Sequence, residues 1–224
     1  MCGRFTLTVD ADSIQTHFPW LETIPQQIAP RYNIAPTQPI AVVPNDGRNA
    51  VDHFVWGLIP FWAKDPSIGS RMINARAETV AQKPSFRAAF KRRRCLILAD
   101  GFYEWKGEKG NKQPMFITLP DRKPFAFAGL WETWNKKPDS DSTYKSCTII
   151  NTQSSESLSK NHHRMTVILN SEIYEPWLDS QNQDLDELKN ILKREIITEL
   201  VSYPVSKKVN SASHNNPACI EPIA

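Results

Sequence analysis

The sequence has little glycine, few cysteines and no long apolar run, and each shortage narrows the class of protein. Glycine accounts for only 8 of the 224 residues against 17 prolines, which favours rigid turns over flexible linkers. The four cysteines lie far apart and form no C-x-x-C pair, which argues against a zinc site and a disulfide framework. No apolar run approaches the ~20 residues of a membrane-spanning helix, and the first residues lack the apolar core of a signal peptide. We therefore expect a cytoplasmic protein with no metal ion and no membrane partner.

The remaining composition is typical of a soluble globular protein. Hydrophobic residues make up 40% and charged residues 23% of the chain, so a core can form without covalent staples. No repeat, low-complexity tract or linker divides the chain, and we predict a single domain over residues 1–224. A net charge of +3 does not by itself indicate a nucleic-acid partner. The basic cluster from Arg87 to Arg94 is either a solvated face or a phosphate-binding patch.

Short apolar segments rich in β-branched and aromatic residues predict most of the secondary structure. The predicted strands cover residues 40–44, 53–60, 94–100, 114–119, 124–131, 146–151 and 165–169. Helical periodicity covers residues 11–18, 76–93 and 183–202. Strands outnumber helices without a strict alternation between them. We therefore predict an α+β fold with a largely antiparallel, barrel-like β-sheet core flanked by helices.

The N-terminus reads MCGRF, which places a cysteine directly behind the initiator methionine. If Met1 is removed, Cys2 carries an α-amine and a thiol on adjacent carbons, and such an aminothiol condenses with an aldehyde to a five-membered thiazolidine. An α-amine titrates at about 8 and a free thiol at about 8.5, so both groups are near their working range. The alternative is that a cysteine in a tolerant chain terminus is incidental.

Three further stretches place reactive side chains at strand ends. MINARAET contains Asn74, which either serves a site or caps a turn. ADGFYEWK sets Glu104 among aromatic residues, where a carboxylate is suited to proton transfer unless it simply points outward from an alternating strand. KNHHRMTVIL carries His162 and His163, which point to opposite sides of an extended chain, so one histidine facing a site is favoured over a metal pair.

Together these stretches resemble the SRAP family, the SOS response-associated peptidases that are understood as abasic-site processing proteins. The motifs that carry the resemblance are MCGRF, RYNIAPTQ at 31–38, WGLIPFWAKD at 56–65, INARAET at 73–79, ADGFYEW at 99–105, the histidine-arginine stretch at 162–169 and YPVSKKVN at 203–210. The resemblance implies that Cys2, freed by removal of Met1, captures the ring-opened aldehyde of an abasic site in single-stranded DNA. The resulting thiazolidine protects the lesion.

The resemblance also implies roles for individual residues. Asn74 positions the cysteine, Glu104 relays protons at the amine, and His162 faces the sugar oxygens. The implied DNA contacts are Arg4 and Arg76 at phosphates, Asn33 and Pro36 along the strand, and Phe61 and Trp62 as a stacking or wedging pair. The implied protein is a monomer that needs no cofactor and no protein partner, and that associates with the nucleoid when bound to DNA. The chain departs from the family pattern at His163 and at Thr166, which stands where the family commonly has proline.

Two other functions remain compatible with the sequence. An N-terminal cysteine hydrolase or peptidase would use Glu104 and His162 to assist the thiolate, and it would turn over many amide bonds. A non-covalent single-strand DNA-binding module would need only the basic and aromatic residues, and it would keep its function without Cys2.

Overall fold

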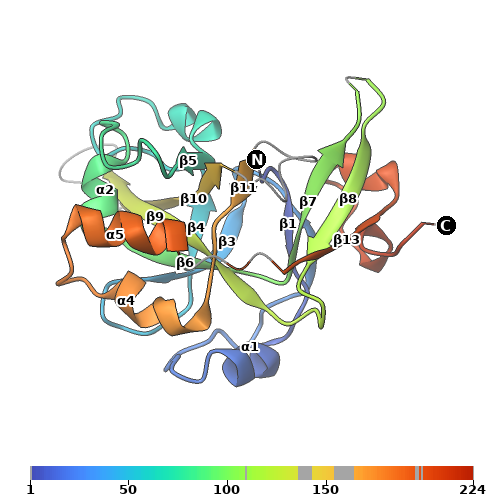
Figure 1. Ribbon diagram of the computed structural model, residues 1–224, viewed down its shortest axis with the longest axis horizontal. Helices are drawn as coiled ribbons and strands as arrows, with labels where there is room; N and C mark the ends of the chain where they lie inside the picture. The colour runs from blue at the N-terminus through green and yellow to red at the C-terminus, as the bar shows by residue number, and fades with distance from the viewer. Residues whose placement is uncertain are drawn as a thin grey trace.

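The fold is organised around a closed ring of five strands in the computed structural model, which describes residues 2–108, 110–135, 143–153, 164–194, 197 and 199–223 (Figure 1). The ring runs in the order β10 (Thr143–Gln153), β4 (Asp52–Trp56), β3 (Pro39–Pro44), β6 (Arg94–Ala99) and β9 (Phe125–Asn135). Pairing of β9 with β10 closes it. Only the β10–β4 pair within the ring is parallel. The predicted α+β fold with a largely antiparallel, barrel-like core is confirmed.

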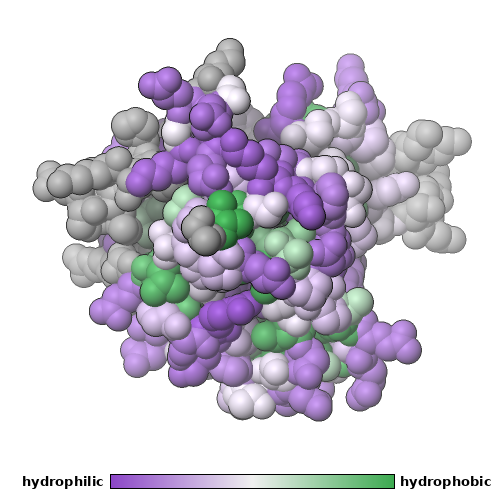
Figure 2. All heavy atoms as spheres, turned by 90° about the vertical axis from the view of Figure 1, so that its right-hand side faces the viewer, coloured by the Kyte–Doolittle hydropathy of each residue, from purple (hydrophilic) through white to green (hydrophobic). Residues whose placement is uncertain are grey.

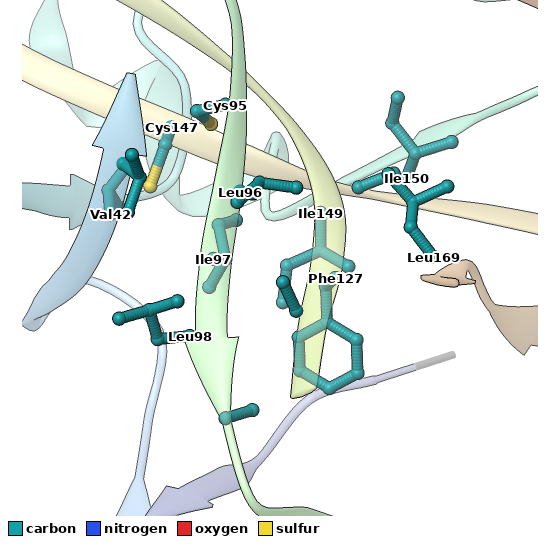
Figure 3. Close-up of a cluster of buried hydrophobic side chains, with 14 of the residues drawn as sticks. Val42, Cys95, Leu96, Ile97, Leu98, Phe127, Cys147, Ile149, Ile150 and Leu169 are labelled. Atoms are coloured by element: carbon teal, nitrogen blue, oxygen red, sulfur yellow. The ribbon is translucent and has the colours of Figure 1, made fainter. Parts of the chain in front are cut away.

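Three short strands extend the ring. β5 (Asn74–Arg76) and β11 (Arg164–Thr166) both pair with β10, and β12 (Ile168–Leu169) pairs with β9. Apolar side chains from the ring strands fill its interior, as Figure 3 shows for Val42, Ile97 and Phe127. Every residue of β6 is buried, because helices α2 (Arg87–Arg92) and α4 (Tyr174–Leu178) cover the outside of the ring.

A second, antiparallel sheet lies beside the ring (Figure 1). Its order is β13 (Val201–Pro204), β8 (Gln113–Thr118), β7 (Gly101–Lys106), β1 (Phe5–Leu7) and β2 (Arg31–Ile34). The C-terminal segment, residues 205–223, covers one side of this sheet and includes the 3-10 turns η3 (Lys207–Asn210) and η4 (Pro217–Cys219). Figure 2 shows that side chains on this face of the molecule are mostly hydrophilic, with only small apolar patches. β1 lies between β7 and β2 in this sheet, and the residues before it extend toward the ring, where Asn74 on β5 contacts the Cys2 carbonyl.

The helices agree with the sequence patterns only in part. α1 (Ala11–His17) is capped by Asp10, whose carboxylate accepts a hydrogen bond from the Ser13 amide at 2.9 Å. The prediction for 11–18 is confirmed. The prediction for 76–93 is wrong over most of its length, since Pro84 interrupts it and the helix starts only at Arg87. Of 183–202, α5 (Leu185–Arg194) forms a helix, whereas Val201 and Ser202 belong to β13.

The remaining 3-10 turns are η1 (Pro66–Arg71) and η2 (Ser171–Ile173). Within the described ranges, no helix is long and apolar enough to cross a membrane.

Arg94 departs from both interpretations of the basic cluster. It is fully buried, and its guanidinium lies 5.7 Å from the centre of the Trp177 ring. The guanidinium donates hydrogen bonds to the backbone carbonyls of Phe90, Lys91, Trp177, Asp179 and Asn182. Burial lowers the pKa of Arg94 to about 10, with Asp179 opposing, so the side chain stays charged at neutral pH. Arg94 thus joins α2 and α4 to the ring and does not face solvent.

We predict that Arg94→Met destabilises the protein by about 3–5 kcal/mol, because several buried carbonyls lose their donor. The matched change Arg92→Met, at an exposed position two residues earlier, should stay within about 0.5 kcal/mol. Urea denaturation of the two variants measures the difference. Equal stabilities would contradict a structural role for Arg94.

Candidate active site

Cys2 lies at the seam between the two sheets, since it directly precedes β1 of the second sheet and contacts Asn74 on β5, which extends the ring (Figure 1 shows both strands). Its side chain is completely buried and belongs to the main apolar core. The Asn74 side-chain Nδ2, from β5 of the ring, donates to the Cys2 carbonyl at 2.8 Å. The thiol donates to the Arg4 carbonyl at 3.5 Å. Contacts from both sheets therefore fix the residue that the sequence singles out.

The thiol is held in its neutral form. Burial, and after it the negative charge of Glu104, raise the pKa of the Cys2 thiol to about 12. A backbone hydrogen bond of Arg4 and the Thr166 hydroxyl lower this pKa but do not compensate for the two causes that raise it. Because the thiolate is the nucleophile, any reaction at this sulfur needs a base that takes the proton.

One face of the β5–β10–β11 unit is polar and lies toward Cys2. Asn74 is opposite Ile149, and Asn151 is opposite both Arg76 and Thr166, so these side chains point the same way. The Asn74 Oδ1, the Asn151 Nδ2 and the Thr166 Oγ1 are buried and make no regular hydrogen bond within the described residues. Buried polar atoms without a partner are few in native proteins, and three of them lie on this one face. The face therefore has hydrogen-bonding groups available beside the thiol.

Glu104 reaches the same place from the second sheet. The Tyr103 amide donates to the Arg4 carbonyl at 2.9 Å, which continues the β1–β7 ladder toward the N-terminus. Glu104 follows on β7, is partly buried, and lies close enough to Cys2 to act on the thiol electrostatically. Its aromatic neighbours are anchored, since the Tyr103 hydroxyl donates to the Tyr32 carbonyl at 2.6 Å. The structure thus brings together Cys2, Asn74 and Glu104.

Arg4 and Asn33 make structural contacts with the C-terminal segment. The Arg4 guanidinium donates to the Asn33 Oδ1 at 2.8 Å and to the carbonyls of Val209 and Asn210 at 2.8 and 3.1 Å. The buried Asn33 amide donates to three carbonyls, those of Val209, Ser211 and His214. These bonds tie β1 and β2 to the segment that follows β13.

Phe61 and Trp62 stand on the surface, with 61% and 47% of their area exposed. The loop that presents them is closed at its base, where Gly57 has φ +134° and a Cβ would lie 2.5 Å from the Gly69 carbonyl oxygen. The Trp134 indole also donates to the Ala63 carbonyl at 2.7 Å. The two aromatic rings are therefore held outward by a packed loop.

The other predicted site residues are placed as follows. Arg76 is exposed at the end of β5, and Pro36 is partly buried in the turn after β2. His162 and His163 lie outside the described residues. No group of three or more His, Cys, Asp and Glu side chains in the described ranges could hold a metal ion.

The network that anchors β11 was not predicted from the sequence. Arg164 donates from Nε to the Asn151 Oδ1 and from Nη2 to Glu78, both at 2.7 Å. Glu78 also accepts from the Gln153 amide at 2.9 Å. The only signal was the position of Glu78 two residues after Arg76, which does not show that its partner comes from a strand far along the chain.

Comparisons with known proteins identify the family. The sequence model of the family described as SOS response associated peptidase (SRAP) matches residues 1–212. The Abasic site processing protein YoqW of Bacillus subtilis (strain 168) is 46% identical over 224 residues, which cover 99% of each chain. The Abasic site processing protein HMCES of Xenopus tropicalis is 30% identical and aligns with 100% of this chain and 78% of its own. A crystal structure of a protein from Bacteroides thetaiotaomicron has a TM-score of 0.86 at 26% identity, with 100% of both chains covered. The chain belongs to the SRAP family.

We predict that Asn33→Ala destabilises the protein by about 2–3 kcal/mol, because three carbonyls and Arg4 lose a buried partner. Amide hydrogen exchange should rise in β1 and in residues 205–223. The exposed Gln27→Ala serves as the control and should change neither measurement. Unchanged exchange in residues 205–223 of Asn33→Ala would contradict the role of Asn33 in holding the C-terminal segment against β1 and β2.

Proposed function

We propose that this protein captures abasic sites in single-stranded DNA covalently through Cys2, after Met1 has been removed, and so protects the lesion. The observation that carries the proposal is the arrangement around Cys2: a buried thiol, a carbonyl held by Asn74, and the Glu104 charge beside the sulfur. The names of the relatives, abasic site processing proteins, supply the substrate class. We infer abasic-site processing from the relatives and the thiazolidine chemistry from the site.

The proposed reaction joins one aldehyde to one aminothiol with loss of one water. The Cys2 amine adds to the C1′ aldehyde of the ring-opened sugar, and the carbinolamine loses its hydroxyl as water to give a protonated imine. The sulfur then adds to the imine carbon, the C=N electron pair moves to nitrogen, and the thiol proton leaves to a base. The product is a thiazolidine in which both groups of Cys2 are consumed. This explains why the cysteine must be terminal.

Each site residue has a step in this scheme. Asn74 orients Cys2 through the carbonyl, and its free Oδ1 accepts from the amine or from a sugar hydroxyl. Glu104 takes and returns protons at the sulfur and the amine. His162 is assigned the sugar oxygens on the resemblance alone.

The DNA strand would follow the surface around the seam. Arg76 is exposed next to Asn74 and can contact a phosphate. Phe61 and Trp62 offer a stacking surface that does not depend on base identity. Space beside Gly3 is open, since a Cβ added there meets nothing within 4 Å. Pro36 would lie along the strand, and Arg4 and Asn33 would shape this surface mainly by fixing β1 and β2.

The two alternative functions predict different behaviour of Cys2. A hydrolase would release product repeatedly, and a non-covalent binder would not need the cysteine. The neutral, buried thiol beside a carboxylate favours the formation of one stable adduct per protein chain rather than repeated hydrolysis. A single domain over residues 1–224 and a monomeric state remain predictions.

The proposal predicts a protein–DNA adduct that survives denaturation when Met1-processed protein meets single-stranded DNA with one abasic site. Cys2→Ala should abolish the adduct, and acetylation of the Cys2 amine should do the same while leaving the thiol intact. Cys219→Ala, which removes another buried thiol, is the matched control and should crosslink normally. Wild type, Cys2→Ala, the acetylated protein and Cys219→Ala are compared on one denaturing gel. No adduct from processed wild-type protein would reject the proposed function.

Glu104→Gln separates an electrostatic role from a proton-relay role. Removal of the carboxylate charge lowers the pKa of the Cys2 thiol, so the thiolate fraction at a fixed pH below that pKa rises and alkylation by iodoacetamide becomes faster. Crosslinking should nevertheless slow by about 10²-fold or more, because the proton acceptor is lost. Glu108→Gln, exposed on the same hairpin, should change neither rate. Crosslinking that accelerates together with alkylation would show that Glu104 is not a proton relay.

A further inference from the structure

Thr166 has a hydroxyl that the fold does not use. The residue is 1% exposed, and its Oγ1 makes no regular hydrogen bond within the described residues. Thr166 lies on the same face of the sheet as Asn74, whose side chain binds the Cys2 carbonyl, so its hydroxyl faces the region of the thiol. It favours the thiolate of Cys2 without the alignment of a regular hydrogen bond. An unpaired buried hydroxyl lowers stability compared with a methyl group of the same shape. The hydroxyl does not stabilise the fold, and its position near the Cys2 sulfur therefore indicates a role in the chemistry of that sulfur.

Strand β11 fixes the direction of this hydroxyl. Thr166 pairs with Asn151 on β10, and Arg164 lies two residues earlier on the same face of β11. Both Nε and Nη2 of Arg164 are held, by Asn151 at 2.7 Å and by Glu78 at 2.7 Å. Threonine is also stiff at χ1, so few rotamers compete. The hydroxyl is held toward the region of the thiol by a braced edge strand.

We propose that Thr166 is a catalytic residue of the capture reaction, whose hydroxyl donates a hydrogen bond to the Cys2 sulfur as the thiolate forms and attacks. This rests on the proposed function. The hydrogen bond is strongest while sulfur carries the negative charge, and it weakens once the S–C bond forms and the C=N electron pair has moved to nitrogen. Proline, the common family residue here, has no hydroxyl, so the contribution is specific to this chain.

Two other groups act on the ionisation of the sulfur. Glu104 on β7 disfavours the thiolate, whereas the backbone of Arg4 favours it. Thr166 is a neutral side chain that favours the thiolate. Its removal should therefore slow the sulfur step without changing the charge of the site.

The test compares Thr166→Val, which keeps the shape, with Thr166→Ser, which restores a hydroxyl. Thr148→Val is the matched control, because Thr148 is equally buried and also has no hydrogen-bond partner among the described residues, but points to the opposite face of β10. Single-turnover adduct formation is measured with abasic single-stranded DNA by gel and with glycolaldehyde by intact mass. Affinity for the DNA is measured in the Cys2→Ala background, and thermal stability for every variant.

Thr166→Val should form both adducts about tenfold more slowly, Thr166→Ser should recover most of the rate, and Thr148→Val should match wild type. DNA affinity should not change, and thermal stability of Thr166→Val should be equal or higher, so that unfolding does not explain the loss. Equal rates for Thr166→Val and wild type would overturn the proposal. So would a loss that Thr166→Ser does not recover, or a loss confined to DNA.

The glycolaldehyde experiment distinguishes failure of the proposed function from failure of the role of Thr166. If wild type reacts with glycolaldehyde but not with abasic DNA, the proposed function fails. The glycolaldehyde rates of the variants then decide the role of Thr166 alone.

Discussion

The hydrogen bond from the Asn74 side chain to the Cys2 carbonyl joins the two sheets at the residue on which the chemistry depends. Cys2 precedes β1, which lies between β7 and β2 in the second sheet, whereas Asn74 stands on β5, which pairs with β10 of the ring. Neither sheet alone can hold the cysteine. The Arg4 and Asn33 contacts with the C-terminal segment secure β1 from one side, and the Arg164 network secures β11 from the other.

Burial keeps the Cys2 thiol protonated in the absence of substrate. The Cys2 thiol is neutral because burial and the Glu104 charge both oppose ionisation. A neutral, covered thiol is protected from oxidation and alkylation, and in the proposed function it becomes nucleophilic only when a proton acceptor and an electrophile are both present. In this account Glu104 both suppresses the thiolate at rest and accepts its proton during reaction. Thr166 would moderate that suppression.

The sequence predicted the sheet-rich architecture and the candidates Cys2, Asn74 and Glu104, because β-branched segments and unusual polar motifs are local signals. It did not predict that Arg94 is buried, since a run of basic residues looks the same whether carbonyls or water surround it. The 76–93 pattern failed over most of its length because Pro84 interrupts it, and the helix begins only at Arg87. The importance of Thr166 depends on contact between residues 164 positions apart in the chain, which no local pattern shows.

The most direct test of the central claim is the identity of the bond in the adduct. Processed protein is crosslinked to abasic DNA, digested with nuclease and protease, and the N-terminal peptide is analysed by mass spectrometry after treatment with a thiol-alkylating reagent. The account predicts a sugar remnant on Cys2 with loss of one water and no alkylation, because amine and thiol are both consumed. A remnant on a lysine, or a Cys2 adduct whose thiol still alkylates, would contradict it.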